Sequence, residues 1–279
     1  MNHPRNRPPS TKAFCILTAI CIFILSSATR ANDLVDAIDS MIAKAVLADG
    51  PGISLIVTRN GKSIYHKARG MANLELGVPL ETSSVFRIGS ITKQFTAAAV
   101  MLLAEDGKLS IEDDITKFLP DYPTHGHKIT IEHLLTHTSG IKSYTDIPHY
   151  TDASIKNDLT VTELIDVFKN QPMDFAPGER FAYTNSGYVL LGAIIEKLSG
   201  ENYESFLQKR IFDPLEMRHS FYGQRSRIIN NRATGYQGSS GQPLNAAFLS
   251  MTQPYTAGSL LSTTGDLDIG PILRQADKP

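Results

Sequence analysis

Hydrophobic positions recur at helical spacing near the start of the chain and then change to a strand-like pattern. Residues 50–52, Gly-Pro-Gly, end the first periodic segment, whose apolar positions are Leu34, Ile38, Ile42 and Val46. Two apolar stretches follow at residues 53–58 and 63–68, joined by Arg59-Asn60-Gly61-Lys62, in which Asn-Gly suits a tight type I′ turn. The pattern predicts a helix followed by a β-hairpin.

The middle of the chain has mostly helical periodicity. An alanine-rich apolar segment from about Ser90 to Asp106, closed by Gly107, predicts one helix, and further helices are expected at residues 130–136, 161–170, 187–198 and 203–211. An isolated hairpin is marginally stable, so strands should return near the C-terminus. The pattern there shows none, and we expect the late sheet strands to be missing.

The first residues form a separate segment. Basic residues precede a 13-residue apolar run from Ala13 to Leu25, and small residues follow at 26–28 and 29–31. This order is typical of a secretory signal peptide. The run reaches only about 20 Å as a helix, short of a hydrocarbon core of roughly 30 Å. We therefore expect residues 1–31 to be a signal peptide and the mature chain to be periplasmic or secreted, without a stable membrane span.

Charge and cysteine content narrow the possible chemistry. The chain holds 27 Lys and Arg against 28 Asp and Glu, and four basic residues precede Asn32 with no acid among them, so the remainder carries 23 − 28 = −5. A mildly acidic body disfavours nucleic acid as a partner. Both cysteines, Cys15 and Cys21, lie in the leader. The body therefore has no disulfide and no thiolate nucleophile.

A serine and a lysine stand close together at the start of the alanine-rich helix. The string FRIGSITKQFTAAAV places Ser90 three residues before Lys93, so the two side chains share one helix face, about 5–6 Å apart at Cβ. A lysine acts as a base only if its pKa falls from about 10.4 toward neutrality. Burial beside Phe95, Ala97 and Val100 is expected to lower it, and N–H groups at the helix start suit a developing oxyanion.

Spacing alone is weak evidence, because a second Ser-x-x-Lys occurs at residues 139–142, which we interpret as a turn. A second pair strengthens the case: FAYTNSGYVLLG places Tyr183 and Asn185 in a short loop before an apolar helix. The phenol is suited to shuttle protons and the carboxamide to bind a substrate carbonyl. The alternative is structural: a core tyrosine, a capping asparagine, and Ser90 as a helix cap beside a surface Lys93.

Four ordered stretches together resemble the serine β-lactamase-like family, nearest to class C β-lactamases and low-molecular-weight penicillin-binding proteins. They are Ser90-Ile91-Thr92-Lys93, Leu134 to Gly140, Tyr183-Thr184-Asn185 and Pro214-Leu215-Glu216-Met217. The resemblance runs from about Gly52 to Leu267. It implies an α+β, β-lactamase/transpeptidase-like fold, with an antiparallel sheet flanked by helices beside an all-helical lobe. On this basis residues 32–279 form one domain: helix and hairpin at 32–73, a mainly helical lobe at 74–230, and an incomplete return to the sheet at 231–279.

The same resemblance implies the roles of the site residues. Ser90 would attack an amide, β-lactam or ester carbonyl and form an acyl-enzyme, while Lys93 and Tyr183 share the proton transfers. Asn185 would hold the acyl side chain of the substrate. The substrate would be a small molecule or peptide, such as a β-lactam, a D-Ala peptide or an ester, and no metal or cofactor would be needed.

The sequence departs from the family near its end. Neither Lys-Thr-Gly nor His-x-Gly occurs, although residues 257–263 still fit, and Ile269-Gly270-Pro271 breaks the helix that Asp266-Leu267 would open. We expect a truncated or frame-shifted copy with little turnover, since the loss of one oxyanion donor lowers rates on the order of 10²–10³-fold.

The sequence leaves three other interpretations to consider. A metallohydrolase is suggested by four clustered histidines, His125, His127, His133 and His137, but their spacing lacks the usual acidic partners. We expect most of them to be loop or helix-surface residues. An α/β-hydrolase is disfavoured because no Gly-x-Ser-x-Gly occurs. A non-catalytic penicillin-binding module, or an inactive truncated copy, stays open as the alternative to the hydrolase.

Overall fold

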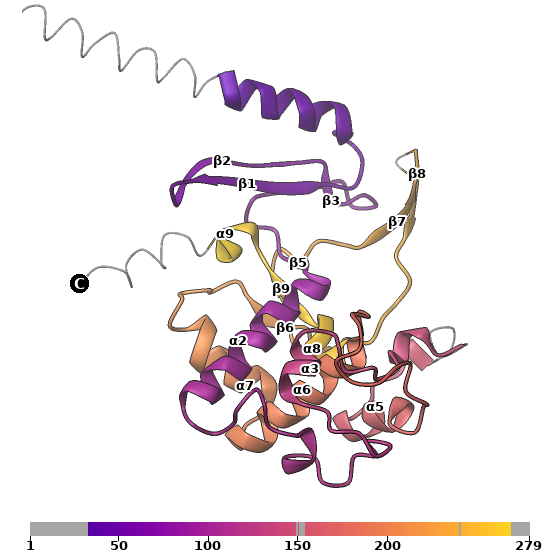
Figure 1. The fold of residues 1–279 in the computed structure, drawn as a ribbon. Coiled ribbons are helices and arrows are strands. Elements are labelled where there is room, and N and C mark those ends of the chain that lie inside the picture. Colours follow the sequence, from indigo (N-terminus) through magenta and orange to yellow (C-terminus); the bar gives the residue numbers. More distant parts are fainter. Residues whose placement is uncertain (1–32, 149, 151–153, 240, 269–279) are drawn as a thin grey trace, which may run out of the picture.

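The computed structural model describes residues 33–148, 150, 154–239 and 241–268 (Figure 1). The expected signal peptide at residues 1–31 lies outside this part of the chain. Among the helices of the described ranges, none has the length and apolar character needed to cross a bilayer.

The N-terminal helix and hairpin are confirmed. Residues 33–45 are helical, and β1 (Ile53–Arg59) pairs antiparallel with β2 (Lys62–Arg69). The turn residues Asn60 and Gly61 have φ values of 50° and 60°, the left-handed conformation that a type I′ turn requires. In Figure 1 the hairpin lies between the N-terminal helix and the rest of the molecule.

The predicted helices of the middle of the chain are confirmed, with shifted ends. The central helix is α6 (Asn185–Ser199), which contacts five others: α2 (Thr92–Glu105), α3 (Ile131–Leu135), α5 (Val161–Phe168), α7 (Tyr203–Leu207) and α8 (Tyr255–Gly258). Beyond α7 the chain continues as a π-helical turn at Gln208–Phe212. A last short helix is α9 (Thr264–Leu267). Thr160 and Glu163 form the expected capping box of α5.

Short strands that the sequence pattern did not predict lie between residues 71 and 262. The three-stranded sheet has the order β5 (Phe86–Arg87), β9 (Leu260–Ser262), β6 (Phe221–Tyr222), with both pairings antiparallel. Two further pairs are β3 (Met71–Asn73) with β4 (Val78–Pro79), and β7 (Tyr236–Ser239) with β8 (Gln242–Asn245). Strands of two to four residues are too short to show a clear alternation. Within the described residues, β1 and β2 pair only with each other.

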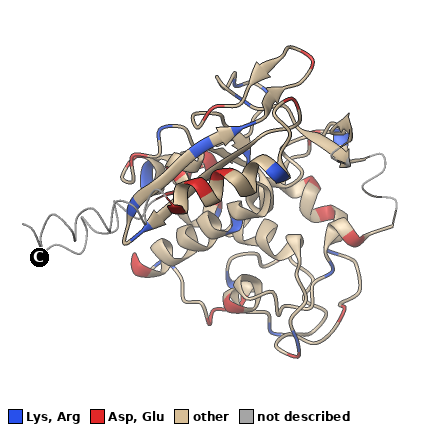
Figure 2. Cartoon of the chain, turned by 90° about the horizontal axis from the view of Figure 1, so that it is seen from above, with Lys and Arg blue, Asp and Glu red and all other residues tan. Residues whose placement is uncertain are grey.

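The hydrophobic core lies in the helical lobe. One continuous cluster of buried side chains joins α2, α3, α5, α6, α7 and α8, while the hairpin contributes no member to it. Basic and acidic residues are interspersed along the chain rather than gathered by sign (Figure 2). The site described next is built on the edge of this core.

Candidate active site

Ser90 lies in a turn whose flanking residues, Ile88 and Thr92, are both hydrogen-bonded to strand β9. Strand β5 leads through Ile88, whose N–H donates to the Leu260 carbonyl of β9 at 3.0 Å, and α2 begins at Thr92, whose hydroxyl accepts from the Leu260 N–H at 3.1 Å. Between them Gly89 has a φ of 51°, a conformation that favours glycine. The turn therefore presents Ser90 at the surface in a fixed position.

The structure brings three of the predicted residues together. The Tyr183 hydroxyl donates to Ser90 Oγ at 2.7 Å, and Lys93 Nζ donates to the same oxygen at 3.3 Å. Ser90 is exposed and Tyr183 is 46% exposed, whereas Lys93 is buried with only 6% exposed. The serine oxygen thus faces solvent while the amine behind it is shielded from solvent.

The ammonium of Lys93 has a complete set of neighbours. It donates to Asn185 Oδ1 and to the Ala257 carbonyl of α8, both at 2.8 Å, and lies 4.6 Å from the ring centroid of Tyr183 and 5.4 Å from that of Tyr188. Burial lowers the pKa of Lys93, and the nearby Tyr183 hydroxyl partly opposes this shift. The lowered pKa enlarges the fraction of neutral amine, the form that accepts a proton.

The predicted burial of Lys93 is confirmed, but its surroundings differ from the expected ones. Phe95 packs edge-on against Phe212 instead, with ring centroids 5.7 Å apart. Two helical positions correspond to about 200°, so Phe95 and Lys93 point to opposite sides of α2. The neighbours identified by the structure come from other elements, which a local pattern does not reveal.

Asn185 joins Lys93 to the loop that follows α3. Its backbone N–H donates to Ser143 Oγ at 3.1 Å, and its Nδ2 donates to Thr145 Oγ1 at 3.2 Å, while Oδ1 accepts from Lys93. The amide therefore has partners for both ends within the protein. Ser143 and Thr145 were missed in the sequence because short hydroxyl residues after a turn carry no distinctive spacing.

Comparison with known proteins identifies the family. The sequence model described as Beta-lactamase matches residues 38–269. The chain belongs to the Beta-lactamase family. Penicillin-binding protein 4* of Bacillus subtilis (strain 168) is 35% identical over 188 residues, which are 66% of this chain and 41% of that protein. Protein flp of Staphylococcus aureus (strain MRSA252) is 31% identical over 191 residues, 67% of this chain and 38% of that protein.

Solved structures confirm the β-lactamase/transpeptidase-like fold of this family member. The octameric penicillin-binding protein homologue from Pyrococcus abyssi matches with a TM-score of 0.71 and 34% identity, over 88% of this chain and 57% of that one. D-amino acid amidase from Ochrobactrum anthropi SV3, complexed with L-phenylalanine, matches with a TM-score of 0.74 and 27% identity, over 87% of this chain and 68% of that one. The chain spans about two fifths of the length of the curated relatives named above.

The second Ser-x-x-Lys, at residues 139–142, is a bend followed by irregular chain, so its serine and lysine do not share a helix face. Ser139 is fully buried, and Lys142 forms an ion pair with Asp174 at 3.0 Å. Gly140 has a φ of 73°, and a Cβ there would lie 2.0 Å from the Phe175 carbonyl oxygen. The segment is fixed by packing, and its lysine serves a salt bridge.

The four clustered histidines lie in loops or on α3, so the expectation for most of them is confirmed. His137 is half-buried in the turn after α3, and its ring lies 4.6 Å from the Tyr183 ring and 5.1 Å from the Tyr188 ring. His133 instead completes the capping box of α3, its Nδ1 accepting from the Thr130 N–H. Across the described ranges no three His, Cys, Asp or Glu residues converge as metal ligands would.

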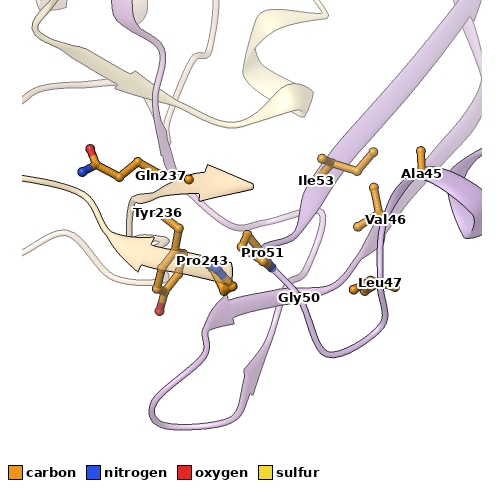
Figure 3. A pocket seen from close by; sticks show the side chains of 10 residues that line it. Ala45, Val46, Leu47, Gly50, Pro51, Ile53, Tyr236, Gln237 and Pro243 are labelled. Atoms are coloured by element: carbon orange, nitrogen blue, oxygen red, sulfur yellow. The ribbon is translucent and has the colours of Figure 1, made fainter. Parts of the chain in front are cut away.

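A separate hollow of about 310 Å³ lies away from this cluster (Figure 3). It is bounded by the end of the N-terminal helix, the start of β1 and the β7–β8 hairpin. Its lining is mostly apolar, and the one ionisable side chain, Tyr236, donates its hydroxyl to Glu75. The Ser90 cluster, which combines a nucleophile, an amine and a phenol, is therefore the candidate for chemistry.

Proposed function

We propose that this chain is a serine hydrolase that cleaves amide, β-lactam or ester bonds through an acyl-enzyme on Ser90. One observation carries the proposal: a solvent-facing serine oxygen lies within hydrogen-bonding distance of both a phenol and a buried amine. Such an arrangement activates a hydroxyl that is a weak nucleophile by itself.

The proposed reaction has two balanced halves. Ser90 Oγ bonds to the carbonyl carbon of the substrate as its proton passes to Lys93 and Tyr183, and the intermediate then expels the amine or alcohol, which takes that proton. Water next attacks the acyl-enzyme, giving its proton to the same pair, and the ester bond to Ser90 breaks as the serine oxygen is reprotonated. The product is the free acid.

Charge on the carbonyl oxygen needs a hydrogen-bond donor. In the described part of the chain, the Ser90 N–H has no backbone acceptor. It lies in the 3₁₀ turn that leads into α2, where the helix dipole favours negative charge. We assign this N–H as one donor to the oxyanion.

The relatives support a class of substrate. Proteins of this family act on small molecules, and the similar proteins are named as penicillin-binding proteins and a D-amino acid amidase. Three probes cover the class: a penicillin for the lactam, a D-amino acid amide, and a p-nitrophenyl ester. We expect Ser90 to accept the acyl group from each of the three probes.

The experiment is mass spectrometry of the purified chain after incubation with a penicillin, combined with product assays on all three probes. We expect an acyl adduct on the peptide that contains Ser90, and its absence in Ser90→Ala. An adduct that decays with release of product supports hydrolysis, whereas a stable adduct supports the alternative, penicillin binding without turnover. If none of the three probes gives an adduct or a product, the proposal is contradicted.

We also propose export, which rests on the leader pattern of residues 1–31. Expressed in a bacterial host with two membranes, the full chain should reach the periplasm or medium with its leader removed. A chain starting at Asn32 should stay in the cytoplasm. Equal distribution of the two chains among the fractions would contradict export.

A further inference from the structure

His137 touches the segment that carries Tyr183 at three points. Its ring centroid lies 4.6 Å from that of Tyr183, with the planes tilted by 32°. Its carbonyl oxygen accepts from the Ala182 N–H at 2.9 Å, and its Nδ1 accepts from the Thr184 N–H at 3.2 Å. The residues before and after the phenol are thus both bonded to one histidine.

The backbone of His137 has an unusual conformation where it makes these contacts. Its φ is 58°, the left-handed region that few non-glycine residues adopt. The ring also lies 5.1 Å from the Tyr188 ring, whose hydroxyl donates to the Leu135 carbonyl at 3.0 Å. The His137 ring therefore contacts both a tyrosine fixed on α6 and the tyrosine that contacts Ser90.

We propose that His137 is a positioning residue that holds the Tyr183 phenol on Ser90, and that it does so only as the neutral imidazole. The inference rests on the proposed function. Protonation would place a hydrogen on Nδ1, which then no longer accepts from Thr184. It would also add a positive charge close to the ammonium of Lys93.

The surroundings of the ring favour the neutral form. The titratable groups that face it are Lys93 from α2, Tyr188 from α6 and Tyr183 from the preceding loop. Burial first, and then the charge of Lys93, lower the pKa of His137. His137 therefore holds the Tyr183 phenol in place at neutral pH, and this hold is lost as acid protonates the ring.

Two variants separate the ring from the acceptor. His137→Asn keeps an acceptor near Nδ1, tolerates a positive φ and does not titrate, but loses the stacked ring. His137→Phe keeps a ring and loses the acceptor. The control is His125→Asn, at an exposed histidine with a φ of 52°.

The first measurement needs no activity. In protein with isotope-labelled tyrosine, the Tyr183 ring signals, assigned with Tyr183→Phe, are followed by NMR from about pH 7.5 to 4.5. We expect them to shift with a midpoint below the ordinary histidine value of about 6.5 in the unsubstituted chain and in His125→Asn, and to stay flat in His137→Asn. Signals that do not respond, or that respond equally in His137→Asn, would overturn the inference.

The second measurement is the rate of acylation of Ser90 by a penicillin. We expect His137→Phe to lower the maximal acylation rate about 10- to 100-fold with little change in penicillin affinity, because a phenol displaced by an ångström reacts poorly. His137→Asn should lose the acid limb of the rate profile. If His137 had a purely structural role, the variants would have a lower melting temperature, but the acylation rate and its pH dependence would not change. That result would overturn the inference. Absence of any acylation in the unsubstituted chain would count against the proposed function alone, and the NMR result would still decide this one.

Discussion

The central helix α6 and the β1–β2 hairpin differ in how they are held. Nine of the 15 residues of α6 are buried, whereas β1 has no buried residue and β2 has one, Tyr65. The contacts of Ser90 with Lys93 and Tyr183 are made entirely within the helical lobe and its short sheet. The geometry around Ser90 therefore depends on packing among the helices and the short sheet, and little of it depends on the hairpin.

Packing around α6 reaches the site directly. Gly192 of α6 lies so close to α8 that a Cβ there would be 2.4 Å from Thr256 Cγ2. The Thr256 hydroxyl donates to the Tyr188 carbonyl of α6 at 2.7 Å. The next residue, Ala257, supplies the carbonyl that holds Lys93. The distance between α6 and α8 therefore sets the position of the amine.

The hairpin contacts its neighbours through polar groups near the surface. Ser54 Oγ lies 2.8 Å from Thr264 Oγ1 of α9, and His66 Nε2 lies 2.9 Å from the same oxygen. On the other side Asp39 accepts from Tyr65 and Lys67 at 2.7 and 2.6 Å. Polar contacts close to solvent stabilise an element less than buried apolar packing does.

The largest effect is expected from filling the gap between α6 and α8, because it should remove both stability and the acyl adduct. Gly192→Val should lower the free energy of unfolding by on the order of 3 kcal/mol, because neither helix can move without breaking buried contacts. The acyl adduct on Ser90 should be lost as well, since α8 carries the partner of Lys93. Urea unfolding and mass spectrometry measure the two effects. The control is Gly241→Val, where a Cβ meets no atom within 4 Å, and an equal loss there would contradict the role of the α6–α8 contact.

The next prediction compares how much stability is lost when one apolar side chain in each region is truncated. Leu191 of α6 is fully buried, whereas Ile56 of β1 is half-buried. Leu191→Ala should lower the free energy of unfolding by about 2–5 kcal/mol, and Ile56→Ala by about 1 kcal/mol. Denaturant unfolding gives both values. Equal losses would mean that the hairpin is as strongly packed as the core, which would remove the contrast.

Local patterns were sufficient for the elements that depend on local physics. The first helix, the Asn60-Gly61 turn and the cap at Thr160 each follow from a periodicity, a φ requirement or a side-chain bond within a few residues. The Ser90 and Lys93 pair follows in the same way from one helical turn. These features were predicted because their partners are neighbours in the sequence.

The rest of the site depends on contacts across long stretches of chain. The Ala257 carbonyl lies 164 residues from Lys93, and an acceptor in the backbone leaves no mark on the sequence. His137 was not distinguished from the other three clustered histidines, because its ring contacts are with Tyr183 and Tyr188, which lie more than 45 residues away in the sequence. The resemblance to a family supplied the link between Ser90 and Tyr183, which spacing alone did not.

The smallest effect concerns the tether between the hairpin and the N-terminal helix. The hydrogen bond from Lys67, and then that from Tyr65, lower the pKa of Asp39. The tether therefore contributes above the ordinary carboxyl pKa of about 3.9, and its contribution is lost as pH falls through the lowered value. Asp39→Asn should speed amide hydrogen exchange in residues 33–45 near pH 6 by a few-fold, and the difference from the unsubstituted chain should vanish near pH 2, measured by mass spectrometry. The control is Asp36→Asn, one turn earlier, which has no ion pair in the described ranges. It should leave the exchange rate of residues 33–45 unchanged at either pH. Equal exchange rates in the two variants would show that the Asp39 contacts do not hold the helix.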